Sequence, residues 1–258
     1  MYISPKLTDK EYAEGKLDEL LKDNKNVNYS ESLHLGVSLR SFRAEKLSAF
    51  VHSLLALDRE AATKLYSEIE SRYPIVLTRD MAKARKWIHK KARGSERTGV
   101  LVTKESARFK PMAIHILPSD EENAVHWFLD DKDNTRSSNY LEDAATEIQV
   151  QGLELDYTCL LWDADMRYEN GSWHYYRFNG QTRWIEQTGN TENNRDLIKY
   201  MLNAYRVLLT RAREGMVICV PEGNANKTAS GFWEDSTRQP SFYNGTYEYL
   251  KSLGIKEL

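Results

Sequence analysis

The sequence lacks several features that would each define a class of protein. No apolar run approaches the roughly 18 residues needed to span a membrane, and the N-terminus has no apolar signal-peptide segment. Only two cysteines occur, Cys159 and Cys219, without metal-ligand spacing, which indicates a reducing setting. The 36 Lys and Arg nearly balance the 38 Asp and Glu, so any nucleic acid must be bound by local patches. We expect a cytoplasmic protein without a membrane partner.

A phosphate-binding loop is also missing. The pattern G-x-x-x-x-G-K-[ST], whose backbone amides cradle phosphates, does not occur; Gly15-Lys16-Leu17 lacks the first glycine and the hydroxyl residue. The six histidines show no ligand spacing, and we predict no metal site. We expect the isolated chain neither to bind ATP tightly nor to hydrolyse it.

Short apolar runs, each bounded by Gly, Pro or charged residues, predict strands buried on both faces of a mainly parallel sheet. These runs are 75–77, 99–102, 113–117, 157–162 and 216–220. Helical spacing of apolar residues lies between them, at 47–55 and 197–208. Because strands alternate with helices, we predict an α/β layered domain.

The organisation along the chain predicts one main domain with two additions. Residues 1–32 read as a peripheral helix and linker, and residues 33–258 as the α/β domain. The stretch 164–194 is rich in aromatic residues and carries Asn170-Gly171 and Asn179-Gly180, which favour type I′ turns. We therefore predict a β-hairpin insertion there. A last helix is expected near 244–253.

A helix that ends in Leu208-Leu-Thr-Arg-Ala-Arg-Glu-Gly215 carries the first candidate site. We expect Gly215 to cap this helix and Arg211 to lie in its last turn. That places Arg211 at the carboxyl ends of the strands, where α/β sheets bind ligands. An alternative is that Arg211 only offsets the negative end of the helix dipole.

The segment Thr146-Glu-Ile-Gln-Val-Gln-Gly-Leu-Glu-Leu-Asp156 precedes the strand at 157–162 and is the second candidate. Beside Gln151, Gly152 would let the backbone approach a nucleotide. Glu154 offers an acceptor for ribose hydroxyls, and Thr146 a donor for a nucleic-acid phosphate. An ordinary turn explains the Gln-Gly pair equally well.

These segments resemble motifs V and VI of superfamily 1 helicases, and Leu35-Gly-Val-Ser-Leu-Arg-Ser41 resembles motif IV, with Arg40 as its arginine. Together with Tyr73-Pro-Ile-Val-Leu-Thr-Arg79, they are similar to the bacterial DUF2075 proteins, the Schlafen group 3-like DNA/RNA helicase family. The resemblance covers about residues 33–255, the C-terminal half of such a protein. Gln151 departs from the lysine usual in motif V, and Asn203 lies where motif VI usually carries an arginine.

The resemblance implies the second RecA-like domain of a helicase-like ATPase. Arg40 and Arg211 would face the γ-phosphate as arginine fingers, Gln151, Gly152 and Glu154 would contact the nucleotide, and Thr146 would contact nucleic acid. ATP and Mg²⁺ would bind only when an N-terminal RecA-like half joins the chain. The pair Asp163 and Asp165 mimics a Mg²⁺-binding strand end, but it follows motif V in the second domain, so we expect it to end the strand and begin the insertion.

Basic residues crowd the predicted helix around Trp87. Lys86 and Lys90 beside an aromatic ring suit single-stranded DNA or RNA, through phosphate neutralisation and base stacking. The alternative is a solvated helix face with Trp87 and Ile88 packed inward. For the whole chain, the rival to a motor domain is a non-catalytic RecA-like module that binds protein or nucleic acid.

Overall fold

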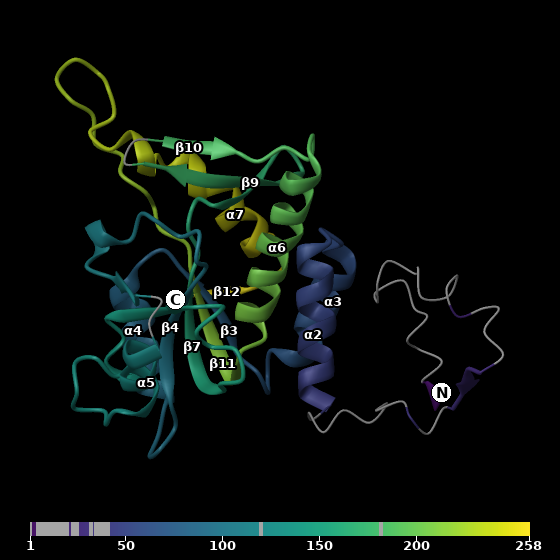
Figure 1. Ribbon diagram of the computed structural model, residues 1–258. Coiled ribbons are helices and arrows are strands. Elements are labelled where there is room, and N and C mark those ends of the chain that lie inside the picture. The colour runs from purple at the N-terminus through teal and green to yellow at the C-terminus, as the bar shows by residue number, and fades with distance from the viewer. Residues whose placement is uncertain are drawn as a thin grey trace. The chain divides into compact units, whose positions relative to one another are not determined.

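Seven parallel strands form the central sheet of the computed structural model, which describes residues 2–3, 21, 26–30, 33, 42–118, 121–180 and 183–258 (Figure 1). Their order across the sheet is β12-β3-β11-β7-β4-β6-β5, and every neighbouring pair is parallel. The bounds are β3 Ile75–Thr78, β4 Thr98–Val102, β5 His115–Ile116, β6 Asp143–Thr146, β7 Leu155–Leu161, β11 Ala212–Cys219 and β12 Lys256–Glu257.

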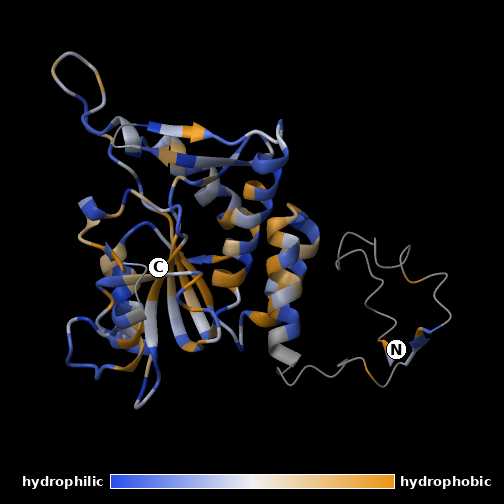
Figure 2. Cartoon of the chain, in the orientation of Figure 1, coloured by the Kyte–Doolittle hydropathy of each residue, from blue (hydrophilic) through white to orange (hydrophobic). Residues whose placement is uncertain are grey.

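The inner strands β3, β4, β6, β7 and β11 are largely buried on both faces, because their side chains alternate between two apolar cores. In β11, Met216 and Ile218 join one core, while Val217 and Cys219 join the other. Figure 2 shows the hydrophobic colour along the strands of the central sheet. A seven-stranded parallel sheet between helical layers confirms the predicted RecA-like three-layer fold class.

Six helices with described bounds accompany the sheets: α2 Phe42–Leu55, α3 Arg59–Ile69, α4 Met81–Lys91, α5 Glu121–Leu129, α6 Glu192–Leu209 and α7 Ser241–Ser252. Residues of α2, α3, α6 and α7 share one core with the sheet, and residues of α4 share the other. The side chains of Asp58, Asp80 and Thr191 accept backbone hydrogen bonds at the starts of α3, α4 and α6, which satisfies amides that a helix leaves open.

Three antiparallel strands make up the segment expected to form a hairpin: β8 Met166–Glu169, β9 Ser172–Asn179 and β10 Arg183–Glu186. Asn170 and Gly171 both have positive φ, 49° and 87°, at the turn between β8 and β9, as a type I′ turn requires. The segment therefore forms a small second sheet.

Two units divide the chain, residues 1–45 and 46–258. In the first, β1 (Tyr2–Ile3) pairs in parallel with β2 (Asn28–Tyr29). The expected N-terminal helix lies largely outside the described residues, as does Arg40. The boundary expected after residue 32 falls in a stretch of which the structure describes only Leu33, so it stays a prediction.

The prediction that Gly215 caps the preceding helix is wrong. Helix α6 ends at Leu209, Thr210 is its C-cap, and Gly215 lies inside β11. A Cβ at position 215 would come within 2.8 Å of the carbonyl oxygen of Pro74. Gly215 is therefore required by the close approach of the chain before β3.

Candidate functional site

The parallel sheet has two edges, which we call the amino edge and the carboxyl edge after the ends of the strands that lie there. β6 ends with Thr146 at the carboxyl edge, and β7 begins with Leu155 at the amino edge. The motif V segment (Thr146–Asp156) therefore crosses from one edge to the other. The motif VI segment (Asn203–Arg213) ends at the amino edge, because Ala212 begins β11 and pairs with Leu155.

Arg211 lies at the amino edge, between the C-cap of α6 and the first residue of β11. The expectation of a site at the carboxyl edge is therefore wrong for this residue. The half-buried guanidinium donates from Nη1 to the carbonyl oxygen of Leu153, at 2.9 Å. This hydrogen bond joins the motif VI segment to the motif V segment directly.

Charged side chains surround this contact. The Nε of Arg213 lies 3.8 Å from Oε2 of Glu154 and 3.9 Å from Oδ1 of Asp156. Asp156 in turn accepts the backbone N–H of Arg97 at 2.8 Å. The Arg213 and Glu154 side chains are 59% and 58% exposed. The amino edge thus presents guanidinium and carboxylate groups to solvent, the groups that bind phosphate oxygens and sugar hydroxyls.

Gln151 and Gly152 lie in the exposed turn before Glu154. Gly152 has φ of +78°, and nothing lies within 4 Å of a Cβ built there. The turn needs glycine for its backbone conformation, since other residues are strained at this φ. The open space above Gly152 also suits the close approach of a ligand, so both interpretations made from the sequence survive.

Thr146 lies apart from these residues, at the carboxyl edge, where it is buried. Its hydroxyl donates to Oε1 of Gln149 at 3.1 Å, and its backbone N–H donates to the same oxygen at 2.9 Å. In this arrangement the hydroxyl is already engaged within the chain. Its contact with a nucleic-acid phosphate stays a prediction, and it requires Gln149 to move.

Asp163 and Asp165 lie buried just past the end of β7, also at the carboxyl edge. Asp165 accepts the hydroxyls of Thr103 at 2.6 Å and Tyr205 at 2.7 Å. Asp163 accepts the backbone N–H groups of residues 107, 108 and 164, and the hydroxyl of Tyr243. Each carboxylate is thus held by several donors from other parts of the fold.

Burial governs the protonation of this pair. Desolvation, reinforced by the charge of Asp163, raises the pKa of Asp165 to about 7. Desolvation also raises the pKa of Asp163 above its usual range, although four hydrogen bonds oppose the shift. Across the described part of the chain, no group of three or more His, Cys, Asp or Glu side chains could hold a metal ion.

Helix α6 touches the motif V segment at both edges. The hydroxyl of Tyr200 donates to Oε1 of Glu147 at 2.7 Å near the carboxyl edge, and Glu147 also accepts the backbone N–H of Lys104. Two residues past the end of the helix, Arg211 donates to the carbonyl oxygen of Leu153. The helix and the crossing segment are therefore joined at two points.

The predicted nucleic-acid residues of α4 lie on one helix. Lys86 and Lys90 are exposed one turn apart, while Trp87 is half-buried. The Trp87 ring meets Tyr157 edge-on at 6.0 Å, and the Lys91 ammonium lies 5.6 Å from its centroid. Trp87 therefore packs against the sheet, as the alternative held, and the two lysines remain at the surface.

A comparison with protein-family models shows to which family the chain belongs. The model for "Schlafen group 3, DNA/RNA helicase domain" matches residues 6–222. The chain belongs to this family. The match includes the motif V and motif VI segments, α4 and the carboxyl-edge aspartates; α7 and β12 follow it. Neither the curated proteins nor the solved structures contain a match. No helix among the described residues is long and apolar enough to cross a membrane.

Membership confirms the resemblance to Schlafen group 3 helicase domains and gives the chain a helicase-related function. Two arginines at the amino edge, Arg97 and Arg213, are not among the site residues predicted from the sequence. Arg213 carries a signal, since it follows Arg211 by two residues and enters the strand beside Glu154. No sequence signal identifies Arg97, because its hydrogen bond to Asp156 depends on the pairing of β4 with β7.

Proposed function

We propose that this chain is the second RecA-like motor domain of a superfamily 1 helicase-like ATPase. The observation that supports the proposal is the hydrogen bond from Arg211 of motif VI to the carbonyl of Leu153, the residue before Glu154. A guanidinium and an exposed carboxylate on one sheet edge fit opposite ends of a nucleoside triphosphate.

ATP would lie between this amino edge and a partner RecA-like domain that carries the phosphate loop, the Mg²⁺ ligands and the carboxylate that orients water. In hydrolysis, water attacks the γ-phosphorus, and the bond to the oxygen that bridges to the β-phosphate breaks, which yields ADP and inorganic phosphate. Arg211 would offset the negative charge that shifts onto phosphate oxygens. Glu154 would accept ribose hydroxyls, and Gln151 and Gly152 would line the approach. Arg40 is proposed as a second arginine on the γ-phosphate.

Reconstitution tests this assignment. The chain is mixed with a separately produced RecA-like domain that contains G-x-x-x-x-G-K-[ST], and ATP turnover is measured with and without single-stranded DNA or RNA. We expect turnover only in the mixture, stimulated by single strands. Mg²⁺-dependent turnover by the chain alone would contradict the proposal, and binding of the strand without any turnover in the mixture would favour the non-catalytic module.

The nucleic-acid part of the proposal assigns the exposed Lys86 and Lys90 to phosphate contacts, with Trp87 as the packed support beneath them. Thr146 is proposed as a further contact at the carboxyl edge. Replacing Lys86 and Lys90 with Glu should abolish single-strand binding in a fluorescence anisotropy titration, because two attractions become repulsions. The exposed pair Lys64 and Lys110, changed in the same way, controls for net charge. Equal binding by the two double variants would remove α4 from the track.

A further inference from the structure

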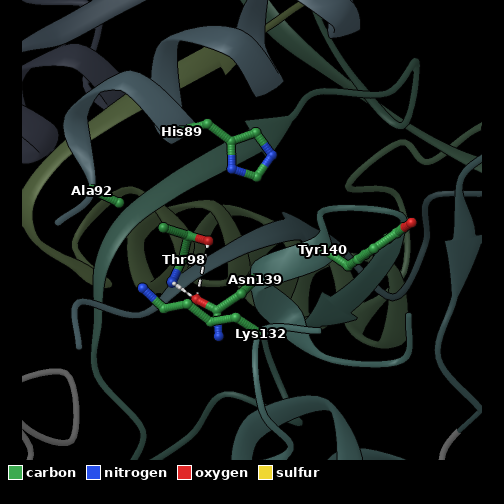
Figure 3. A pocket seen from close by; sticks show the side chains of 6 residues that line it. All are labelled: His89, Ala92, Thr98, Lys132, Asn139 and Tyr140. Atoms are coloured by element: carbon green, nitrogen blue, oxygen red, sulfur yellow. Dashed lines mark hydrogen bonds between the residues drawn. The ribbon is translucent and has the colours of Figure 1, made fainter. Parts of the chain in front are cut away.

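A cavity of about 510 Å³ opens at the end of α4, at the amino edge of the sheet. Three segments line it: His89 and Ala92 from the end of α4, Thr98 at the start of β4, and Lys132, Asn139 and Tyr140 from the connection between α5 and β6. Figure 3 shows these six side chains around one space, with Thr98 and Asn139 joined by hydrogen bonds. The volume is in the range of small-ligand pockets.

The floor of the cavity is neutral and rigid. Oδ1 of Asn139 accepts the backbone N–H of Thr98 at 3.1 Å and its hydroxyl at 3.4 Å. The amide nitrogen Nδ2 of Asn139 donates to Oγ of Ser137 at 3.3 Å. Thr98 and Asn139 are both buried. The floor therefore offers fixed polar atoms rather than a charge.

Among the described residues, those that line the cavity include a lysine and no carboxylate. Lys132 donates from Nζ to the carbonyl oxygen of Gly94, which holds its ammonium beside the end of α4, and His89 lines the cavity from the helix. Asp131 and Asp133 flank Lys132 in the sequence, but neither lines the cavity. The ammonium of Lys132, together with the imidazole of His89 in the lining, favours an anionic ligand.

Tyr140 adds an aromatic surface. The residue is 41% exposed, although the turn that carries it is held by hydrogen bonds on both sides. Asn139 binds Thr98 on one side, and on the other the carbonyl of Leu141 accepts Nε of Arg85 at 3.0 Å. An exposed ring on a fixed turn is suited to stacking with a base.

We propose that this cavity binds one nucleotide of a single strand, with its phosphate at Lys132 and His89 and its base against Tyr140. Lys86, His89 and Lys90 share one face of α4, because residues three and four apart on a helix are neighbours. The basic face therefore leads directly to the cavity. This inference rests on the nucleic-acid part of the proposed function and adds a base-binding position to it.

Binding of fluorescent single-stranded oligonucleotides to the full chain tests the proposal. Tyr140→Ala should weaken affinity about tenfold, the loss typical of one stacked base, and Tyr140→Phe should restore it. Lys132→Gln should lower the slope of log affinity against log salt by about 0.7, one phosphate contact. The matched controls are Phe232→Ala, an exposed aromatic residue in the 221–235 loop, and Lys64→Gln on α3.

The outcomes separate this site from the wider function. If Tyr140→Ala and Lys132→Gln bind like their controls while the Lys86 and Lys90 double variant fails, the cavity assignment is wrong and the track survives. If the unaltered chain binds no single strand, both fail, whereas the ATPase of the reconstituted protein is judged separately. Displacement of the oligonucleotide by micromolar mononucleotide would identify a free-nucleotide site and overturn the single-strand assignment.

Discussion

At the amino edge of the sheet, Arg213 and Glu154 expose more than half of their side chains and form only a long ion pair. At the carboxyl edge, Asp163 and Asp165 are buried and accept hydrogen bonds from four segments of the chain. Exposed ion pairs contribute little to stability, whereas buried carboxylates that lose their partners are costly. The amino edge is therefore open to ligands, and the carboxyl edge at β7 holds the fold together.

The largest expected effect concerns Arg211. In the reconstituted ATPase, Arg211→Ala should lower turnover by about 10³–10⁵, as removal of an arginine finger does. Arg211→Lys should also fail, because a point charge cannot replace the planar guanidinium. Thermal melting should change little. Arg183→Ala, an exposed arginine of β10, serves as the control, and full single-strand-stimulated turnover by Arg211→Ala would exclude the arginine-finger role.

The opposite behaviour is expected at Asp165. Asp165→Ala should lower the free energy of unfolding by about 2–5 kcal/mol, since the buried hydroxyls of Thr103 and Tyr205 lose their acceptor. Turnover per folded molecule should stay near normal, because we assign this carboxylate no metal. Denaturant titration measures the loss, with the exposed Asp131→Ala as control. A stable Asp165→Ala protein that has lost turnover would reverse the assignment of the two edges.

Protonation of Asp165 makes the carboxyl edge sensitive to pH. The folded-state pKa of about 7 exceeds the unfolded value of about 3.9, so between these values the folded state binds more protons. The contribution of Asp165 to the free energy of unfolding should therefore fall as pH rises from about 4 to 7, then level off. Asp165→Asn removes this titration. The difference in unfolding free energy between the unaltered chain and Asp165→Asn should decline over that window; a constant difference would contradict the pKa shift.

The smallest effect is expected at Arg213. Arg213→Gln breaks only exposed ion pairs with Glu154 and Asp156, so the free energy of unfolding should change by no more than about 1 kcal/mol. The same variant should weaken nucleotide affinity of the reconstituted ATPase if Arg213 orients Glu154. A large loss of stability would show that the amino edge is as structural as the carboxyl edge.

The sequence predicted the strands that contain a near-continuous apolar run, namely β3, β4, β5, β7 and β11. The run from Met216 to Val220 is continuously apolar because both of its faces are buried. β6 escaped prediction because Asp143-Ala-Ala-Thr146 has weak strand propensity, and it forms by pairing with β4 and β5. Gly215 was wrongly predicted to be a helix cap, because glycine is common at helix ends. The structure requires glycine there for another reason, the close approach of Pro74.

The position of Arg211 was wrong for a topological reason. A helix that precedes a parallel strand runs back across the sheet, so its last turn must lie where the strand begins. Helix α6 is followed within three residues by β11, so that direction was implicit in the sequence. The cavity beside α4 could not be predicted from the sequence, because the residues that line it lie between positions 89 and 140 and come together only in the folded chain.

Helix α6 runs between the two sheet edges and is connected to the motif V segment near each of them. From Tyr200 to its last residue, Leu209, the helix rises about 14 Å, at 1.5 Å per residue. Tyr200 within the helix and Arg211, two residues beyond its end, both bind the same crossing segment. A ligand that displaced Arg211 would break one of these two connections, and the other, from Tyr200 to Glu147, lies next to Thr146. Thermodynamic linkage makes such coupling reciprocal: a single strand that tightens nucleotide binding by some factor must itself be bound tighter by that factor once nucleotide is present.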